Sequence, residues 1–231
     1  MKQPENVRLF DHIFLTDDPD NNNVEAAVEK GMYRNFGKRV MDIVLVLVGL
    51  PFVLPVMFVI ALAIFKSGGP VFYSQARLGL NGRVFRLWKF RSMVVDADEA
   101  LADYLASNPD SAKEWQISQK LRRDPRITTV GHFIRKTSLD ELPQLLNVLK
   151  GDMSLVGPRP MMPEQREMYP GTRYEKLHPG ISGFWQISER NNVSFAERAR
   201  FDSEYYNKLS LATDIVVLTK TLAVVCRGSG V

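Results

Sequence analysis

Asp140 and Glu141 are adjacent carboxylates inside residues 135–160, RKTSLDELPQLLNVLKGDMSLVGPRP, a run more polar than a core segment needs. Arg135 precedes the pair, and Arg159 follows it after one predicted helix and a short predicted strand at 153–156. Prolines on both sides of Arg159 stiffen its backbone, so its planar fork can be aimed at a phosphate at low entropic cost. Carboxylates beside guanidinium groups suggest a metal-assisted phosphoryl-transfer site.

A helix is predicted to begin at this pair of carboxylates. Ser138 and Glu141 match a capping box, whereas Pro143 disfavours helical geometry at Leu142, so the helix starts either at Ser138 or near Pro143. Either start leaves the carboxylates at a helix N-terminus, where unpaired N–H groups favour anions. Helix capping alone is therefore the alternative interpretation of the two acids. The predicted inward stripe of this helix consists of Leu145, Leu146 and Leu149.

Residues 40–65 form the second informative stretch, because 23 residues without a charge follow Asp42. A straight helix of that length extends roughly 35 Å, enough to cross a bilayer core. Pro51 and Pro55 interrupt its middle, and cations flank both ends, which draws both ends to the cytoplasm. We therefore predict a helix-break-helix that enters and leaves by the same face, in preference to a simple span or a buried helix.

Charge is distributed unevenly along the 231 residues, whose net charge is +4. Residues 1–29 hold seven acidic groups against Lys2 and Arg8, a net of −5, so residues 30–231 carry +9 by difference. A basic body indicates anionic partners such as phosphates or an acidic membrane face. Its cations are dispersed among turns without a nucleic-acid-binding motif, so we expect no nucleic acid. The single cysteine, Cys226, excludes an internal disulfide framework.

We expect a mostly helical α+β fold, with a single compact cytoplasmic domain after an N-terminal re-entrant membrane segment. A β-hairpin is predicted over 71–90, because short alternating runs flank a glycine-containing turn. The predicted organisation is an acidic, flexible arm at 1–33, the re-entrant helix at 34–66 and a catalytic domain with membrane-associated helices at 67–231. Further helices are predicted at 96–107, 111–121, 194–208 and 212–225.

Several long motifs together resemble the bacterial sugar transferase family. They are the membrane helix broken near Pro51, KFRSM at 89–93, DPRIT at 124–128, the 135–160 run, and PGISGFWQIS at 179–188. The resemblance covers about residues 34–231 and is nearest to the exopolysaccharide-type enzymes that move a hexose 1-phosphate. It implies transfer of a sugar 1-phosphate from a UDP-sugar, such as UDP-glucose or UDP-galactose, to polyprenyl (undecaprenyl) phosphate. UMP would be released, at the cytoplasmic face of the bacterial inner membrane.

The resemblance also implies roles for individual residues. Asp140 would be the nucleophile that takes the phosphosugar, Glu141 its partner, and both would hold Mg²⁺, with Mn²⁺ as an alternative. The basic positions that match the family's phosphate- and nucleotide-binding positions are Arg135, Arg159, Lys89 and Arg91. Two residues depart from the family pattern: Leu50 stands before Pro51 where serine is common, and Glu189 replaces a common glycine.

Elementary chemistry supports these roles. An aspartate with an ordinary pKa near 4 is ionised at neutral pH and needs no activating base. Its anionic carboxylate must approach an anionic diphosphate, so a divalent cation and basic side chains are needed to screen the charge. Carboxylates with phosphates suit magnesium rather than zinc. A catalytically inactive membrane scaffold stays the alternative, with membrane lipids as partners in both cases and the oligomeric state left open, a homodimer included.

Overall fold

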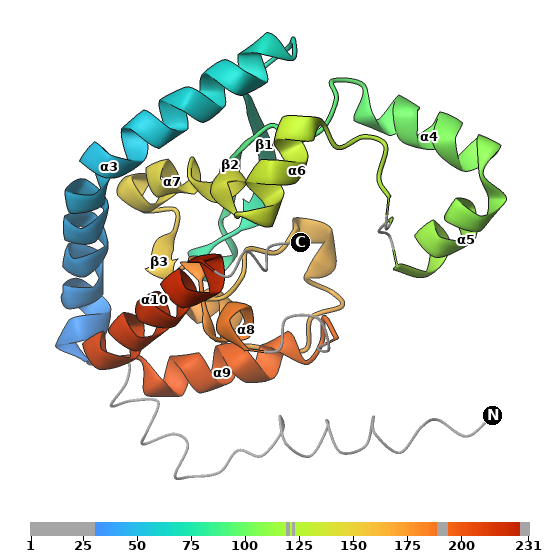
Figure 1. Cartoon of the computed structure of the whole chain (residues 1–231). Coiled ribbons are helices and arrows are strands. Elements are labelled where there is room, and N and C mark those ends of the chain that lie inside the picture. The colour runs from blue at the N-terminus through green and yellow to red at the C-terminus, as the bar shows by residue number, and fades with distance from the viewer. Residues whose placement is uncertain (1–30, 119–120, 122, 189–193, 227–231) are drawn as a thin grey trace, which may run out of the picture. The chain divides into compact units, whose positions relative to one another are not determined.

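The computed structural model describes residues 31–118, 121, 123–188 and 194–226, and Figure 1 shows that helices dominate these ranges. The predicted mostly helical α+β composition is confirmed there. The α-helices are α3 Lys38–Lys66, α4 Ala97–Ser107, α5 Pro109–Ser118, α6 Thr129–Lys136, α7 Gln144–Lys150, α8 Phe184–Ile187, α9 Arg198–Lys208 and α10 Leu211–Cys226. The strands are β1 Phe72–Leu78, β2 Val84–Phe90, β3 Ser154–Val156 and β4 Gly180–Ser182. Shorter helical turns lie at Tyr33–Gly37, Leu80–Gly82, Leu139–Glu141, Pro163–Gln165 and Tyr174–Lys176.

Contacts divide the chain into two compact units. The first unit takes the described residues up to Val46 together with Ala76–Phe85 and Val148–Thr221. The second unit takes Leu47–Gln75 and Arg86–Asn147, with the described residues from Leu222 onward. The catalytic domain predicted at 67–231 therefore contributes to both units. Of the arm predicted at 1–33, all but the last three residues lie outside the described ranges.

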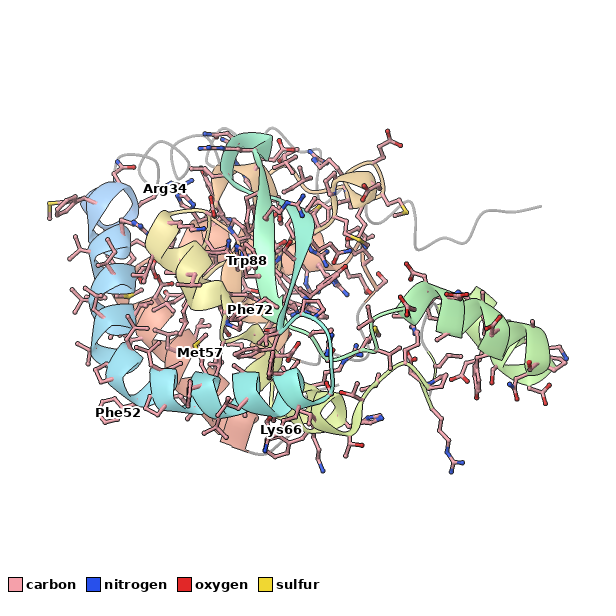
Figure 2. The ribbon with its side chains drawn as sticks, turned by 90° about the horizontal axis from the view of Figure 1, so that it is seen from above. Arg34, Phe52, Met57, Lys66, Phe72 and Trp88 are labelled. Carbon is pink, nitrogen blue, oxygen red and sulfur yellow. The ribbon has the colours of Figure 1, made fainter. Side chains whose placement is uncertain are left out.

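Helix α3 is continuous over 29 residues, with Pro51 and Pro55 inside it. Its ribbon changes direction beside Phe52 (Figure 2), because a proline in a helix interior removes a hydrogen bond and bends the axis. The stretch Tyr33–Lys66 is long and apolar enough to cross a membrane. Its exposed apolar side chains include Leu47, Val48, Phe52, Leu54, Phe58, Val59, Leu62 and Phe65. The two predicted helices are thus one bent helix, and its entry and exit by one face stay a prediction.

In the second unit, the later part of α3 packs against β2 and α6 through an apolar cluster. The buried members are Ile60, Ile64, Phe90 and Ile134. Leu139 and Leu142 pack against this cluster from the turn that follows α6. The turn that carries the predicted carboxylates is therefore held by apolar side chains on both sides, which fixes its position relative to β2.

In the first unit, a buried polar cluster fixes the beginning of α3. Lys38 Nζ lies 2.7 Å from Asp214 Oδ2, and the Tyr33 hydroxyl donates to the same oxygen at 2.7 Å. The Tyr205 hydroxyl donates to the other carboxylate oxygen at 2.7 Å. We call Tyr33, Lys38, Tyr205 and Asp214 the anchor cluster. It joins the start of α3 to α9 and α10, so each buried polar group has a partner.

Strands β3 and β4 form a parallel pair in which Ser154 faces Gly180, and the strand predicted at 153–156 is confirmed. Gly157 follows β3 and lies against the segment that leads into β4. A Cβ atom on Gly157 would lie 2.2 Å from the carbonyl oxygen of His178, so only glycine fits there. The glycine that opens the GPRP motif therefore has a packing role, and it sets the path of the chain toward Arg159.

Of the three leucines predicted to face inward on helix α7, Leu145 and Leu149 are partly buried and Leu146 is exposed. Leu146 is 47% exposed, whereas Gln144 and Asn147 are 3% and 0% exposed. The Asn147 amide donates to the Arg86 carbonyl at 2.7 Å and accepts the Trp88 backbone N–H at 3.1 Å. The prediction for Leu146 is wrong because an asparagine that satisfies two backbone groups of β2 turns this face of α7 inward.

The other predicted helices are confirmed with shifted ends: α5 stops at Ser118, and α9 begins at Arg198. Helix α4 matches the prediction for 96–107 to within one residue, and α5 begins at Pro109 rather than at Ser111 because proline suits the first helical position. The capping box before α9 is present. The Ser194 N–H donates to Glu197 Oε2 at 2.7 Å, and the Glu197 N–H donates to Ser194 Oγ at 3.3 Å.

Candidate active site

Asp140 and Glu141 lie together on the turn Leu139–Glu141, and Lys89 of β2 reaches both of them. Lys89 Nζ is 2.8 Å from Glu141 Oε1 and 3.6 Å from Asp140 Oδ2. The side chains of Lys89, Asp140 and Glu141 are 25%, 13% and 18% exposed. We call these three residues the dyad cluster. One lysine thus bridges two carboxylates, at a place that solvent still reaches.

The backbone around the dyad cluster is unusual. Ser138 has φ 57° and ψ 18°, the left-handed region that non-glycine residues seldom adopt, and its side chain does not cap the turn. The predicted capping box at Ser138 is therefore wrong. The Glu141 N–H bonds the Ser138 carbonyl at 3.3 Å, and α7 starts only at Gln144. Apolar packing of the flanking leucines compensates for the strained residue and holds the turn in place.

Burial raises the pKa of the Asp140 carboxyl above its ordinary value. The Lys89 ammonium acts in the opposite direction, Glu141 adds to the increase, and Arg135 lowers it again. The ordinary pKa assumed from the sequence is thus too low for Asp140. This aspartate takes up a proton at a higher pH than a surface aspartate does.

Arg135 lies in the last turn of α6, one residue before that helix ends. Its charge acts on Asp140, so the two predicted site residues lie near each other in the second unit. Arg135 Nη1 is buried and has no hydrogen-bond partner among the described residues. A buried donor beside two carboxylates is suited to an oxygen of a phosphate ligand.

Arg91 lies elsewhere in the second unit. Its Nη2 donates to Ser67 Oγ at 3.1 Å and to the Gly68 carbonyl, just after α3 ends. The side chain is only 8% exposed. The structure thus places Arg91 against the end of α3, and its predicted contact with phosphate stays a prediction.

Sequence reasoning missed Asn147 as a residue that positions the site. Its side chain bonds the Arg86 carbonyl and the Trp88 N–H of β2, directly before Lys89. Asn147 therefore fixes the strand from which the lysine reaches the dyad. The signal available in the sequence was a single amide within the apolar run LLNVL. A polar residue in such a run is usually buried with partners.

The DPRIT motif has a structural role. Asp124 and Arg126 form a bidentate pair, with Arg126 Nη2 2.7 Å from Asp124 Oδ2, and the guanidinium lies over the Trp115 ring at 5.0 Å. The Thr128 hydroxyl accepts the Gly131 N–H at 2.9 Å and so caps α6. The motif thereby fixes the start of the helix that carries Arg135 in its last turn.

Arg159 belongs to the first unit, where its guanidinium lies 5.6 Å from the centroid of the Trp185 ring. The structure therefore brings together Lys89, Asp140 and Glu141, with Arg135 near them. Arg159 lies in the first unit, whereas these four residues lie in the second. Glu189, the predicted departure from the family pattern, lies outside the described residues. Leu50 lies inside α3, one residue before Pro51.

The dyad cluster offers an incomplete set of metal ligands. Within the described ranges, no group of three or more His, Cys, Asp or Glu side chains is placed to hold a metal ion. Two carboxylates fit Mg²⁺ or Mn²⁺ when phosphate oxygens and waters supply the remaining ligands, which is the common arrangement for magnesium with nucleotides. The residues therefore fit an ion that arrives with a diphosphate, and they do not fit a structural zinc.

Comparison with known proteins gives matches over most of the chain. The family described as "Bacterial sugar transferase" matches residues 33–228. The exopolysaccharide production protein ExoY of Rhizobium meliloti is 44% identical over 208 residues, which cover 87% of this chain and 92% of that protein. The undecaprenyl-phosphate galactose phosphotransferase of Salmonella typhimurium is 47% identical over 197 residues, 84% of this chain and 41% of that protein. The UDP-glucose:undecaprenyl-phosphate glucose-1-phosphate transferase of Escherichia coli is 39% identical over 196 residues, 80% of this chain and 39% of that protein. The chain thus spans nearly all of ExoY and less than half of the two longer relatives.

Proposed function

Since the chain belongs to the bacterial sugar transferase family, we propose that it transfers a sugar 1-phosphate from a UDP-sugar to polyprenyl phosphate. The names of the two longer relatives both include undecaprenyl phosphate; one name gives galactose as the sugar, and the other gives UDP-glucose. These names support a UDP-hexose donor and undecaprenyl phosphate as the acceptor here. The name of ExoY supports a place in exopolysaccharide production. Polyprenyl diphosphate sugar and UMP would be the products.

The observation that carries this proposal is the dyad cluster, two solvent-accessible carboxylates that share one lysine. In the first step an oxygen of Asp140 bonds to the phosphorus that carries the sugar, and the bond to UMP breaks, so UMP leaves with the electron pair. In the second step a phosphate oxygen of the lipid bonds to the same phosphorus. The bond to Asp140 then breaks, and the carboxylate is restored.

The other residues make this attack feasible. Lys89 lowers the pKa of Asp140 against the effect of burial, and thereby keeps more of the nucleophile ionised. Glu141 holds Lys89 at 2.8 Å, and Arg135 offers a buried donor to a phosphate oxygen. A magnesium ion held by Asp140 and Glu141 with the diphosphate would neutralise phosphate charge and favour the departure of UMP. Each group acts on charge, which is the main obstacle when a carboxylate approaches a diphosphate.

The activity is tested with purified protein in nanodiscs that contain polyprenyl phosphate. We expect UMP release and transfer of labelled sugar into the lipid fraction with UDP-glucose or UDP-galactose, from a panel of UDP-sugars. Excess chelator should abolish UMP release, and Mg²⁺ or Mn²⁺ should restore it. A folded protein that releases no UMP with any donor would be a scaffold and not a transferase, and full activity in chelator would contradict the metal assignment.

We further propose that α3 enters and leaves the inner membrane by its cytoplasmic face. Two prolines inside the helix, its bend beside Phe52 and cations on both flanks support this topology. Single cysteines at Arg34 and Gly69, in a Cys226→Ser background, should both be shielded from an impermeant thiol reagent in right-side-out vesicles. Labelling of only one of them would establish a span.

A further inference from the structure

Trp185 of α8 carries two guanidinium groups over its ring. Arg198 Cζ lies 4.0 Å from the ring centroid, and Arg159 Cζ lies 5.6 Å from it. Arg198 also lies over the Phe195 ring at 5.2 Å. All four residues belong to the first unit. The electron-rich faces of the rings offset part of the repulsion between two like charges held this close.

Donors in this cluster lack acceptors. Trp185 Nε1 and Arg198 Nε are buried, and neither has a hydrogen-bond partner among the described residues. Indole and guanidinium nitrogens can only donate, so each of these atoms needs an acceptor from another group. Leaving a buried donor unpaired is costly, which makes a ligand with several acceptor oxygens the natural complement.

The nearby acid does not neutralise the cluster. Asp202 lies four residues after Arg198 on α9, and its Oδ2 accepts the hydroxyl of Tyr169. Burial raises the pKa of Asp202 to about 7, against the opposing effects of the Tyr169 hydrogen bond and the Arg198 charge. A carboxyl with that pKa is about half protonated at neutral pH. Asp202 therefore offsets the positive charge of Arg198 only in part.

We propose that Arg198, Arg159 and Trp185 form a phosphate-binding site, in which Arg198 and the Trp185 N–H bind substrate directly. The sequence singled out Arg159 alone, and the structure adds the other two. Phosphate oxygens can accept from both guanidinium forks and from the indole nitrogen, and their negative charge suits the arginines. The inference rests on the proposed function in one respect: the phosphate belongs either to the UDP-sugar or to the lipid acceptor.

Steady-state kinetics of three variants test this site. Arg198→Gln removes the charge, Trp185→Phe keeps the ring and removes only the N–H, and Arg200→Gln is the matched control. Arg200 is an exposed arginine on the same helix, so its variant makes the same change in net charge. KM is measured for UDP-glucose at saturating lipid and for polyprenyl phosphate at saturating UDP-glucose. The thermal shift given by pyrophosphate and the unfolding temperature of each variant are measured alongside.

We expect Arg198→Gln to raise one KM by about 10-fold or more and Trp185→Phe to raise the same KM severalfold, with kcat much less affected and the control unchanged. The substrate whose KM rises identifies the source of the phosphate. Both KM values unchanged within twofold would show that the arginines only pack on the ring, and would overturn the proposal. A wild type that releases no UMP refutes the proposed function instead. The pyrophosphate shift then decides: its loss in Arg198→Gln supports the site, and an equal shift in both proteins overturns it.

Discussion

Lys38 and Lys89 each meet a carboxylate at nearly the same distance, 2.7 Å in the anchor cluster and 2.8 Å in the dyad cluster. Their surroundings differ. The Lys38 and Asp214 side chains are 9% and 0% exposed, and two tyrosine hydroxyls also donate to the Asp214 carboxylate. Lys89 divides its charge between two carboxylates that remain 13% and 18% exposed. A lysine–carboxylate pair is therefore closed off from solvent in one unit and open to solvent in the other, where we propose that the reaction takes place.

The difference lies in how completely each carboxylate is satisfied. Asp214 receives three donors from regular helices and from the turn before α3, so a ligand would gain little by displacing them. Asp140 has a shared cation, a raised pKa and a left-handed residue two positions before it. Shifted pKa values of this kind cluster at functional sites, which makes Asp140 the stronger candidate for chemistry.

Among variants of the dyad cluster, Asp140→Asn should reduce catalytic activity the most. The amide keeps the shape of the side chain and removes the nucleophile, so we expect kcat for UMP release to fall by roughly 10³-fold or more. Folding and membrane insertion should be unchanged, as measured by circular dichroism and by fractionation. An Asp140→Asn protein with near-normal turnover would remove the dyad cluster from the chemistry.

Asp214→Asn should act on stability and leave the chemistry of the dyad intact. Removing one partner of a buried ion pair leaves Lys38 uncompensated, which costs on the order of 3–5 kcal/mol of unfolding free energy. Denaturant unfolding in detergent measures this loss. The double variant Lys38→Met with Asp214→Asn should recover part of it, because no buried charge is then left alone. A single variant as stable as the wild type would mean that the anchor cluster contributes nothing.

Lys89→Gln should reduce kcat/KM by about 100-fold, because one preorganised cation is lost from a site that accumulates negative charge. Lys89→Arg keeps the charge and should recover most of this loss. The unfolding temperature should change little for both variants, in contrast to Asp214→Asn. Equal activity of Lys89→Gln and wild type would show that the lysine is only a surface partner of Glu141.

The pH dependence offers a finer test. Because the pKa of Asp140 is raised, the acid limb of kcat/KM should lie at a higher pH than an ordinary aspartate gives, and Lys89→Gln should move it higher still. The stability of the folded protein depends on pH in the opposite direction to its activity. A carboxyl that binds its proton more tightly in the folded state makes the protein less stable as pH rises from the unfolded pKa through the raised one. The unfolding free energy of Asp140→Asn should therefore exceed that of the wild type at neutral pH, and this difference should shrink on acidification. A difference that stays constant with pH would contradict the raised pKa.

Local patterns predicted much of the fold and the centre of the site. Periodicity and turn residues predicted the hairpin at 71–90, α4 and α10, and the run of polar residues led to Asp140. The anchor cluster was beyond such reasoning, because Lys38 and Asp214 are 176 positions apart and each looks like an ordinary helix residue. The prediction for Leu146 of α7 was wrong for a related reason: the partners of Asn147 lie on a strand some 60 residues earlier. Long-range polar pairing leaves no period in the sequence.

The covalent intermediate on Asp140 is the central claim, and intact-protein mass spectrometry tests it directly. Wild-type protein is mixed with UDP-sugar and the divalent cation in the absence of polyprenyl phosphate. We expect one equivalent of UMP and an added mass equal to the sugar phosphate, and we expect no added mass on Asp140→Asn. Release of UMP only when the lipid is also present, with no adduct on the wild type, would mean that the sugar phosphate passes directly between the two substrates and would contradict the account.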